Sequence, residues 1–499
     1  MNFTVPDFDT FKALAGSGNL IPVYREIMAD LDTPVTAFMK LSEGENSFLL
    51  ESVAGGERWA RYSFIGWDPR VVIRSEAGRV SCTRDGEVTE LPHDGNPLMA
   101  VRDYMKRFTP VTVEGLPPFT GGAVGFLAYD MVRFFDDIPV DLAGKEKPGL
   151  GWDDFCFLIT DRMVVVDNAR QVIQVVVNVH TDESSDLKAA YDAAIKEIDS
   201  TVERLRQPRP VREVKAPGPP SGVESNLTRE RYLEMVETAK EYIRAGDIFQ
   251  VVLSQRFHTP LGCEPLDLYR ALRRINPSPY MYFLKLGERY VVGASPEILV
   301  RTVGGKVALR PIAGTRPRGG DPEEDRRLEK ELHADEKECA EHLMLVDLAR
   351  NDVGRVATTG SVKVDDFMVT ERYSHVMHIV SHVSGELSEA HDAYDVLVSC
   401  FPAGTLSGAP KIRAMQIIEE LEPSPRGLYG GAVGYFGFDG SSDMAINIRT
   451  VMVESGVAYL QAGAGIVADS DPQSEFEESE AKARAVVRAI ALAQQGLDT

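Results

Sequence analysis

One run of the sequence reads as a helix that carries two acidic side chains at the head of an apolar stripe. Residues 335–352 read DEKECAEHLMLVDLARND, in which Glu338 and Glu341 are three residues apart and share a helical face. Leu345 and Leu348 continue that face as a stripe of the kind that a helix buries. Carboxylates on a buried stripe are costly unless they are paired, protonated or bound to a cation. The run therefore predicts a helix whose acidic end faces a cleft, where a hard divalent ion would suit both carboxylates.

A second run near the C-terminus repeats this spacing. Glu475 and Glu478 open the stretch SEFEESEAKARAVVRAIALA, and Lys482 follows on the same helical face. Two such helices can converge on one cation. Acidic residues also favour the first turns of helices that begin in solvent, so the pattern alone leaves both interpretations open.

The composition limits the class of protein. The chain has 499 residues, of which 43% are hydrophobic and 26% charged, and this is typical of a soluble globular protein with two or three domains. Its net charge of −22 argues against nucleic acid or an anionic membrane as a partner. No apolar run approaches the roughly 20 residues that a membrane span needs. The first residues, MNFTVPDFDTFKALA, do not resemble a secretory signal, so a cytoplasmic protein is expected.

The cysteines favour the same compartment. They lie far apart and form no CxxC pair, which is typical of reduced thiols rather than of disulfides or zinc ligands: Cys82, Cys156, Cys263, Cys339 and Cys400. None of them lies in the Gly-x-Cys-x-Gly pattern of a glutamine-hydrolysing nucleophile. The chain is therefore not expected to hydrolyse glutamine itself.

Strand-like and helix-like runs are mixed along the chain. The first expected strands are at residues 35–41, 47–52, 62–66 and 71–74. Residues 207–225 read QPRPVREVKAPGPPSGVES, and their proline and glycine content predicts a linker. This linker would divide an N-terminal region, residues 1–206, from a C-terminal region, residues 226–499.

A short internal repeat bears on the fold class. GGAVGF at residues 121–126 recurs as GGAVGY at residues 430–435, which favours two related β-layers packed together. The expected fold class is α+β, with two β-rich layers and helices packed between and around them.

Further segments carry side chains suited to an anionic ligand. FPAGTLSGAPKIRAM places Thr405 and Ser407 before an expected helix N-terminus, which fits either an anion cradle or a well-capped helix. Arg449 ends a half-buried apolar alternation, where an arginine binds either a ligand carboxylate or an internal acid. Gly463 and Gly465, in QAGAGIVA, allow the backbone to approach a ligand closely.

His378 lies in RYSHVMHIVSHV, where three histidines are spaced three and four residues apart. The spacing permits a shared helical face and a metal site, although the alternation is also typical of a strand. One of the histidines as a general base is a further possibility, because imidazole takes a proton near neutral pH.

Taken together, these segments resemble the chorismate-utilising enzymes, and among them the anthranilate synthase large subunits. The most specific matching blocks are PIAGTRPRG at residues 311–319, KECAEHLMLVDLARND at 337–352, GTLSGAPK at 404–411, GGAVGYFG at 430–437 and QAGAGIVADSDPQSE at 461–475. The resemblance runs from about residue 19 to residue 493, with the linker unmatched.

The resemblance implies a function for individual residues. It implies that Mg²⁺ is held by Glu338, Glu341, Glu475 and Glu478 and binds the ring carboxylate of chorismate. It implies that Glu297 protonates the departing hydroxyl, that His378 takes part in the loss of pyruvate, and that Thr405 belongs to the catalytic group. The substrate would also contact Gly314, Thr315, Tyr429, Arg449, Gly463, Ala464, Gly465 and Lys482.

Two positions distinguish the subfamilies. Isochorismate and salicylate synthases carry a water-activating lysine where this chain has Gln250, and aminodeoxychorismate synthases typically carry a nucleophilic lysine where it has Ala313. Both departures favour ammonia as the nucleophile and anthranilate as the product. Aminodeoxychorismate synthase component I is the alternative, because some members of that branch also lack the lysine. The ammonia would come from a separate glutamine amidotransferase subunit, so a hetero-oligomer is expected.

The N-terminal region resembles the regulatory part of the same family. LLES at residues 49–52 and NPSPYMY at residues 276–282 match segments that form a feedback site for tryptophan. The implied inhibitor contacts are Glu51, Ser52, Pro279, Tyr280, Met281, Val433, Gly434 and Tyr435. A non-catalytic tryptophan-sensing subunit is a remote alternative that predicts damage among the four glutamates, His378 or Glu297, and the sequence carries none.

Overall fold

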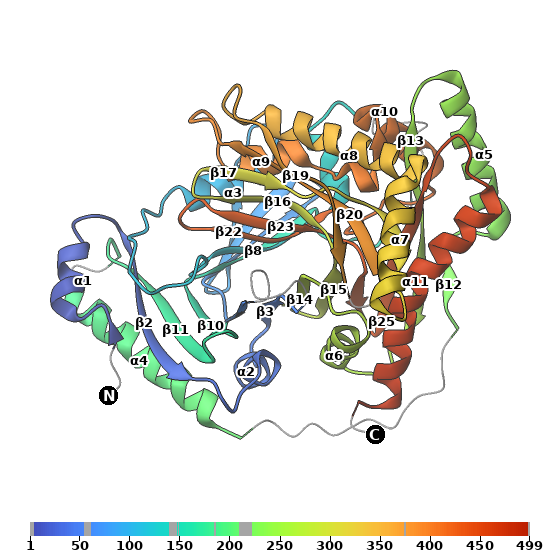
Figure 1. The fold of residues 1–499 in the computed structure, drawn as a ribbon. Helices are drawn as coiled ribbons and strands as arrows, with labels where there is room; N and C mark the ends of the chain where they lie inside the picture. The colour runs from blue at the N-terminus through green and yellow to red at the C-terminus, as the bar shows by residue number, and fades with distance from the viewer. Residues whose placement is uncertain are drawn as a thin grey trace.

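The computed structural model describes residues 4–53, 61–138, 147, 149–183, 186–208, 222–373 and 376–497. Within these residues, two antiparallel sheets pack face to face and helices cover their outer faces (Figure 1). The expected α+β class with two β-rich layers is confirmed. Side chains of the strands, such as Val124, Val165 and Leu284, fill the space between the sheets.

The first sheet, sheet 1, joins strands from both ends of the chain. Its pairing order is β1 (Thr4–Val5), β2 (Leu20–Met28), β11 (Val172–His180), β10 (Arg162–Asp167), β4 (Tyr62–Trp67), β3 (Asn46–Glu51), β14 (Tyr280–Leu286), β15 (Arg289–Ser295), β24 (Thr450–Glu454), β25 (Val457–Ile466), β13 (Gln250–Pro260) and β12 (Glu224–Ser225), with β21 (Gly408–Ala409) also paired to β13.

The second sheet, sheet 2, likewise joins strands from both halves of the chain. Its pairing order is β18 (Ile312–Pro317), β20 (Val376–Glu386), β17 (Lys306–Leu309), β16 (Ile298–Val303), β23 (Ser442–Ile446), β22 (Ala432–Gly437), β8 (Gly122–Leu127), β9 (Phe155–Thr160), β5 (Val71–Glu76), β6 (Arg79–Arg84) and β7 (Glu87–Leu91), with β19 (Lys363–Arg372) paired to β20.

The helices divide between the two outer faces. The outer face of sheet 1 packs against α1 (Phe8–Leu14), α2 (Pro34–Leu41), α4 (Leu187–Arg206), α6 (Pro265–Ile275) and α11 (Pro472–Gln495). Near β13 and β25 lie α5 (Arg229–Ala245) and α10 (Lys411–Leu421). The outer face of sheet 2 packs against α3 (Leu98–Met105), α8 (Glu336–Gly354) and α9 (Ala393–Cys400), and α7 (Pro322–Ala334) lies beside β18 and β20.

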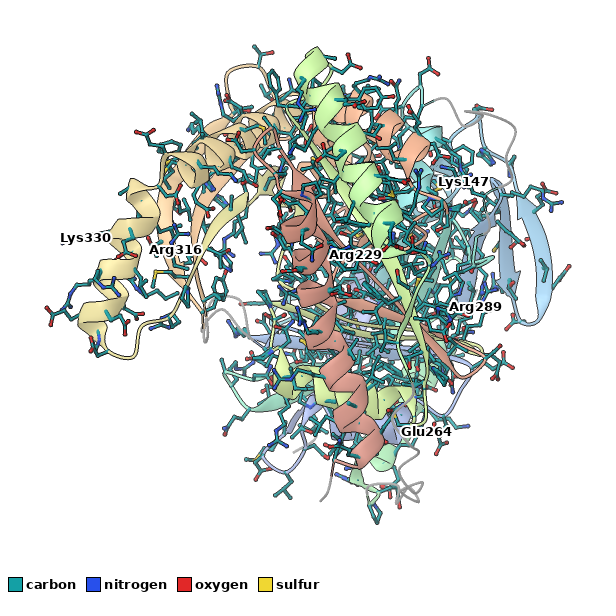
Figure 2. The ribbon with its side chains drawn as sticks, turned by 90° about the vertical axis from the view of Figure 1, so that its right-hand side faces the viewer. Lys147, Arg229, Glu264, Arg289, Arg316 and Lys330 are labelled. Atoms are coloured by element: carbon teal, nitrogen blue, oxygen red, sulfur yellow. The ribbon has the colours of Figure 1, made fainter. Side chains whose placement is uncertain are left out.

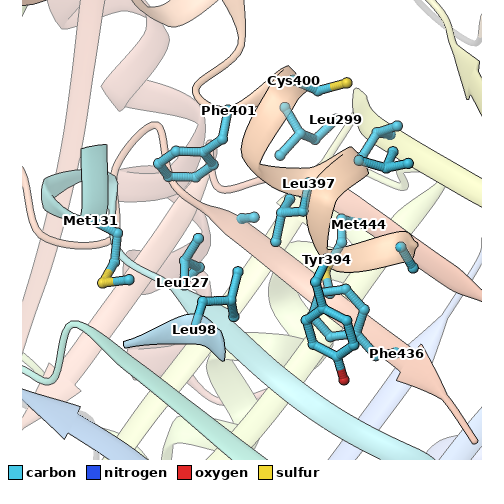
Figure 3. Close-up of a cluster of buried hydrophobic side chains, with 14 of the residues drawn as sticks. Leu98, Leu127, Met131, Leu299, Tyr394, Leu397, Cys400, Phe401, Phe436 and Met444 are labelled. Atoms are coloured by element: carbon cyan, nitrogen blue, oxygen red, sulfur yellow. The ribbon is translucent and has the colours of Figure 1, made fainter. Parts of the chain in front are cut away.

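The core under α9 shows how these layers are held together. Tyr394 and Leu397 of this helix lie over Phe436 and Met444 of the central strands of sheet 2 (Figure 3). The Tyr394 and Phe436 rings stack with their centroids 4.1 Å apart. Burying such large apolar side chains is the main favourable contribution to folding.

The internal repeat marks the centre of sheet 2, where β8 and β22 lie side by side. Gly125 pairs with Gly434, so the two copies of the motif meet at their equivalent positions. A side chain at either glycine would collide with the next strand, at 1.9 Å from the Cys156 carbonyl oxygen and 2.0 Å from that of Asp443. The repeat therefore relates the two halves of one sheet and not the two packed layers that it was expected to relate.

The same relation extends through sheet 1. From its centre outward, the order β3, β4, β10, β11, β2 on one side matches β14, β15, β24, β25, β13 on the other, with the same connectivity along the chain. The two halves of the chain therefore share one topology. Each half supplies strands to both sheets, and residues 209–221 of the expected linker lie outside the described residues.

The prediction of a strand over residues 35–41 is wrong, because this segment forms α2. The hydroxyl of Thr33 accepts a hydrogen bond from the Thr36 amide, and the Thr36 hydroxyl accepts one from the Thr33 amide. Pro34 occupies the first helical position. This capping box and the helical spacing of the buried side chains outweigh the strand preference of the β-branched residues.

In the described part of the chain, no helix has the length and apolarity that a membrane crossing requires.

Candidate active site

A cavity of about 700 Å³ opens between the end of sheet 1 that contains β13 and β25 and the end of sheet 2 that contains β18 and β20. Strands β13 and β25 with helix α11 form one wall, and β18, β20 and α8 form the other. The second wall is part of a projecting lobe that carries Arg316 on β18 and Lys330 on α7, and it lies beside α11 in Figure 2. The four glutamates of the two acidic runs all line this cavity.

The acidic residues concentrate negative charge in a partly buried space. Burial, with the charge of Glu338 as a second cause, raises the pKa of Glu341 above its usual value. Burial also raises the pKa of Glu475, with a further contribution from Glu478 and against a hydrogen bond from Ser470. Carboxylates that repel one another in this way gain most from a cation placed between them.

Basic side chains already pair with two of the four glutamates. The guanidinium of Arg316 contacts Glu338 at 3.2 Å, and the ammonium of Lys482 contacts Glu478 at 2.7 Å. The amide nitrogen of Gln250 lies 3.5 Å from Glu341. Within the described residues, no three His, Cys, Asp or Glu side chains are close enough together to hold a metal directly. The structure thus brings the four glutamates to one cavity, but not into one coordination shell.

Arg449 reaches the cavity from the turn between β23 and β24. Its backbone has a φ of +52°, a left-handed conformation that is rare for residues other than glycine. Burial lowers the pKa of its guanidinium, and no carboxylate of the described chain pairs with it. A half-buried arginine without an internal partner is suited to an anionic ligand. The buried ring of Tyr429 lines the same part of the cavity.

Glu297 and Thr405 form a hydrogen-bonded pair at the inner end of the cavity. The Thr405 hydroxyl donates to Oε1 of Glu297 over 3.2 Å. Burial raises the pKa of Glu297 to about 8, and the hydrogen bond from Thr405 partly opposes this shift. Near neutral pH this side chain is therefore a carboxylic acid that can give up a proton to a bound ligand.

His378 lies on β20, so the strand alternation rather than the helical spacing applies to this segment. Its Nδ1 is 3.0 Å from the Gly314 carbonyl oxygen and 3.0 Å from the Thr315 hydroxyl. Because a carbonyl only accepts, Nδ1 carries the proton and Nε2 keeps its lone pair. Burial, with the charge of Arg449 as a lesser cause, lowers the pKa of the imidazole. The neutral ring is therefore a base directed at the cavity.

The backbone of β25 forms one side of the cavity. Gly463 faces the cavity, and its carbonyl oxygen accepts a 3.0 Å hydrogen bond from Lys482. A side chain at Gly465 would lie 2.7 Å from the amide nitrogen of Gln250. Ala464 points the other way, into the buried cluster with Leu253, because successive residues of a strand face opposite sides.

Only part of the segment before α10 reaches the cavity. Thr405 lines it, whereas the Ser407 hydroxyl is buried and donates to the Ala403 carbonyl oxygen over 3.0 Å. Lys411 pairs with Asp352 at 2.9 Å. The segment is a folded helix entry and not the anion cradle that the sequence also allowed.

The sequence did not single out Arg316, although it lies within the PIAGTRPRG block. Its guanidinium bridges Glu338 and Asp335, at 3.2 and 2.7 Å. A basic residue in a segment otherwise rich in glycine and proline was the available signal.

A second cavity, of about 460 Å³, lies between the centres of the two sheets. All the residues that the resemblance assigned to the inhibitor line it: Glu51, Ser52, Pro279, Tyr280, Met281, Val433, Gly434 and Tyr435. The Ser52 hydroxyl is buried there, without a hydrogen-bond partner among the described residues. The Glu51 carboxylate instead accepts hydrogen bonds from Tyr269 at 2.5 Å and Arg273 at 3.2 Å, so its charge is balanced internally.

Comparison with known proteins agrees with this geometry. A family model described as chorismate binding enzyme matches residues 45–488. The chain belongs to the chorismate binding enzymes. The anthranilate synthase component 1 of Pseudomonas aeruginosa is 49% identical over 496 residues, covering 98% of this chain and 99% of that protein. The crystal structure of anthranilate synthase component I from Streptococcus pneumoniae superposes with a TM-score of 0.77 at 38% identity, covering 93% of this chain and 99% of that one.

More distant chorismate binding enzymes share the fold. A menaquinone-specific isochorismate synthase from Escherichia coli has a TM-score of 0.69 at 18% identity, covering 97% of this chain and 98% of that one. At this identity the match carries the fold alone. The chain is thus a chorismate-utilising enzyme, and the residues of its cavity must decide which reaction it performs.

Proposed function

We propose that the chain converts chorismate and ammonia to anthranilate, pyruvate and water. The observation that carries this proposal is Arg449, a half-buried cation without an ion-pair partner among the described residues, in the same cavity as an acid, Glu297, and a base, His378. Chorismate carries two carboxylates, and the relatives that match this chain over nearly its whole length are anthranilate synthase components.

The chain's own residues fit the two halves of the reaction. In the first, ammonia forms a bond to ring carbon C2 while the hydroxyl at C4 leaves, and Glu297 supplies the proton that makes it water. In the second, the free Nε2 of His378 accepts a proton from the ring while the bond between the ring and the enolpyruvyl oxygen breaks. The departing enolpyruvate then takes up a proton from solvent and becomes pyruvate. Arg449 and Tyr429 would hold the enolpyruvyl carboxylate throughout.

Magnesium is part of the proposal. The donors that line the cavity are carboxylate oxygens, which are the ligands that Mg²⁺ prefers. Burial raises the pKa of Glu341 and of Glu475, so a cation bound beside them would stabilise their charged forms. Glu338, Glu341, Glu475 and Glu478 would hold the ion, in part through water, since they do not form a direct shell. Bound there, it would balance the ring carboxylate and withdraw electrons from the ring.

Ammonia fits the cavity better than water as the nucleophile. Gln250 stands where isochorismate synthases carry the lysine that activates water, and its amide is not a base. Ala313, likewise, offers no nucleophile. Ammonia needs no activating base, so the absence of a lysine at both positions favours it over water. Its source would be a second component, a glutamine amidotransferase, as the name component 1 of the relatives suggests.

The direct test incubates the purified chain with chorismate, Mg²⁺ and ammonium at mildly alkaline pH and records anthranilate fluorescence. We expect anthranilate, measured by its fluorescence, and pyruvate to appear in equal amounts. Consumption of chorismate to a non-fluorescent amino product would instead support aminodeoxychorismate synthase component I. No consumption at all would support a non-catalytic sensing subunit.

We further propose that the second cavity binds tryptophan as a feedback inhibitor. Its volume suits an amino acid with a large aromatic side chain, and its walls combine apolar and aromatic groups with polar ones. The buried Ser52 hydroxyl lacks a partner and offers a hydrogen bond to the ligand.

Substitution of Ser52 tests this assignment. A leucine at this position would fill part of the cavity, so we expect Ser52→Leu to raise the tryptophan concentration for half inhibition at least about tenfold. The ammonia-dependent kcat should stay near that of wild type, because the residue does not line the active-site cavity. Ser17→Leu, at an exposed position, is the matched control. Unchanged inhibition in Ser52→Leu would place the inhibitor elsewhere.

A further inference from the structure

Arg426 and Glu422 form the most completely buried ion pair beside the active-site cavity. Their side chains are 2% and 4% exposed, and two of their atoms lie 2.6 Å apart. They lie between α10 and β22, and neither lines the cavity. Two charges are costly to bury, so a pair kept this far from water calls for a local reason.

The guanidinium of Arg426 reaches two cavity-lining segments. It donates to the Leu406 carbonyl oxygen over 2.7 Å and to the Val252 carbonyl oxygen over 2.6 Å. Leu406 follows Thr405, the partner of Glu297, and Val252 belongs to β13 on the wall that carries Gln250. With two more hydrogen bonds to Glu422, the guanidinium donates four in all. These bonds hold both segments and Glu422 together.

Aromatic rings enclose the same guanidinium. Its central carbon lies 4.6 Å from the centre of the Tyr129 ring and 5.6 Å from that of the Tyr429 ring. Tyr429 lines the active-site cavity. An arginine packed against ring faces fixes their position as well as its own.

Glu422 extends the network along β13 and on to the neighbouring strand, β25. Its Oε1 accepts hydrogen bonds from the Ser254 amide at 2.9 Å and from the Ser254 hydroxyl at 2.8 Å. The same hydroxyl accepts a 2.8 Å hydrogen bond from Gln461, which lines the cavity on β25. The pair thus connects β13, β25 and the segment that follows Thr405 through hydrogen-bonded polar groups.

We propose that Arg426 is a positioning residue for the reaction, and that with Glu422 it sets the separation of Thr405, Tyr429 and strand β13 around the substrate. It touches neither substrate nor reacting atoms. Its effect passes through the Leu406 carbonyl, the Tyr429 ring and the Val252 carbonyl. This inference rests on the proposed function, because it concerns how that cavity is kept in shape.

Two variants test it. Arg426→Lys keeps the charge beside Glu422 but loses the planar fork that reaches both carbonyls. The double variant Glu422→Leu/Arg426→Met removes both charges with similar volume, so it leaves no buried charge unpaired and should fold. Arg25→Lys is the matched control, since Arg25 is a buried arginine in the N-terminal half, paired with Asp199 at 2.5 Å.

The readout is the ammonia-dependent KM for chorismate together with kcat, each measured on chain shown to be folded by circular dichroism. We expect both variants to raise KM at least about tenfold and to lower kcat, because a displaced Thr405 and Tyr429 no longer fit the substrate. A network that only stabilised the fold would reduce the active fraction and leave KM unchanged.

The outcomes separate this inference from the proposed function. A wild-type chain that forms no anthranilate would overturn the proposed function. An active wild type with folded variants of unchanged KM would overturn the positioning role alone. If both variants fail to fold under conditions that keep Arg25→Lys folded, the pair serves stability and the inference also fails.

Discussion

Glu297→Gln is expected to lower the ammonia-dependent kcat by a factor of about 10²–10⁴, because an amide cannot protonate the departing hydroxyl. The acid works only in its protonated form. With a pKa of about 8, the wild-type kcat should therefore fall as the pH rises through about 8, and the residual activity of the variant should lack this limb. The measurement is kcat against pH at saturating chorismate, with the ammonium concentration corrected for the fraction present as free ammonia.

Stability gives an independent check on the same side chain. A carboxyl whose pKa is raised on folding binds its proton more tightly in the folded state. The free energy of unfolding then decreases as the pH rises from about 4.5, the ordinary value, to about 8. Removing the group removes this loss, so Glu297→Gln should melt at a higher temperature than wild type near pH 8. Glu386→Gln, at an exposed position, should change neither kcat nor melting temperature. A Glu297→Gln enzyme with wild-type kcat would contradict the assignment.

Local patterns predicted the elements that frame the site. The spacing of Glu338 and Glu341 predicted a helix over residues 335–352, and α8 spans Glu336–Gly354. The same spacing of Glu475 and Glu478 predicted a helix in the second acidic run, where α11 spans Pro472–Gln495. These predictions succeeded because the periodicity of a helix is written in neighbouring residues. The failure at α2 has the same origin, since a capping box there resembled the β-branched start of a strand.

The relations between distant segments could not be predicted from local pattern. The glycine-rich repeat indicated kinship between two strands but not that they would pair with each other at Gly125 and Gly434. The spacing of Glu422 and Arg426 is that of an ordinary surface pair on a helix, and only the packing of β13 and of the Tyr129 and Tyr429 rings around them buries it. The backbone conformation of Arg449 likewise has no signal in the sequence around it.

The resemblance to the family predicted the residues of the second cavity, which local sequence patterns did not indicate. The lining of the second cavity comes from segments more than two hundred residues apart, joined where β3 pairs with β14. Nothing in the composition of those segments indicates a binding site. Residue-by-residue transfer from the family placed all eight predicted contacts on one cavity, although Glu51 turned out to be neutralised by Arg273.

The glutamates that would hold Mg²⁺ give the second large effect. Glu338→Gln and Glu478→Gln each remove one negative charge from the cavity. We expect each to weaken Mg²⁺ binding at least about tenfold and to lower activity by a similar factor or more. Their melting temperatures without Mg²⁺ should stay near that of wild type, because both side chains are partly exposed and their ion pairs contribute little. Isothermal titration calorimetry with Mg²⁺ and chorismate measures the affinity directly. Full Mg²⁺ affinity in either variant would exclude that glutamate as a ligand.

Substitution of Arg316 is expected to change the Mg²⁺ affinity in the opposite direction to substitution of Glu338. Its guanidinium contacts Glu338 at 3.2 Å, so it competes with a metal for that carboxylate. Arg316→Gln should therefore bind Mg²⁺ more tightly than wild type, whereas Glu338→Gln binds it more weakly. Glu477→Gln, at an exposed position of α11 outside the cavity, is the matched control and should leave Mg²⁺ affinity unchanged. Opposite shifts from these two substitutions are the result expected if the ion binds beside the Glu338 carboxylate. Shifts of the same sign would mean instead that both substitutions disturb the shape of the lobe that carries them.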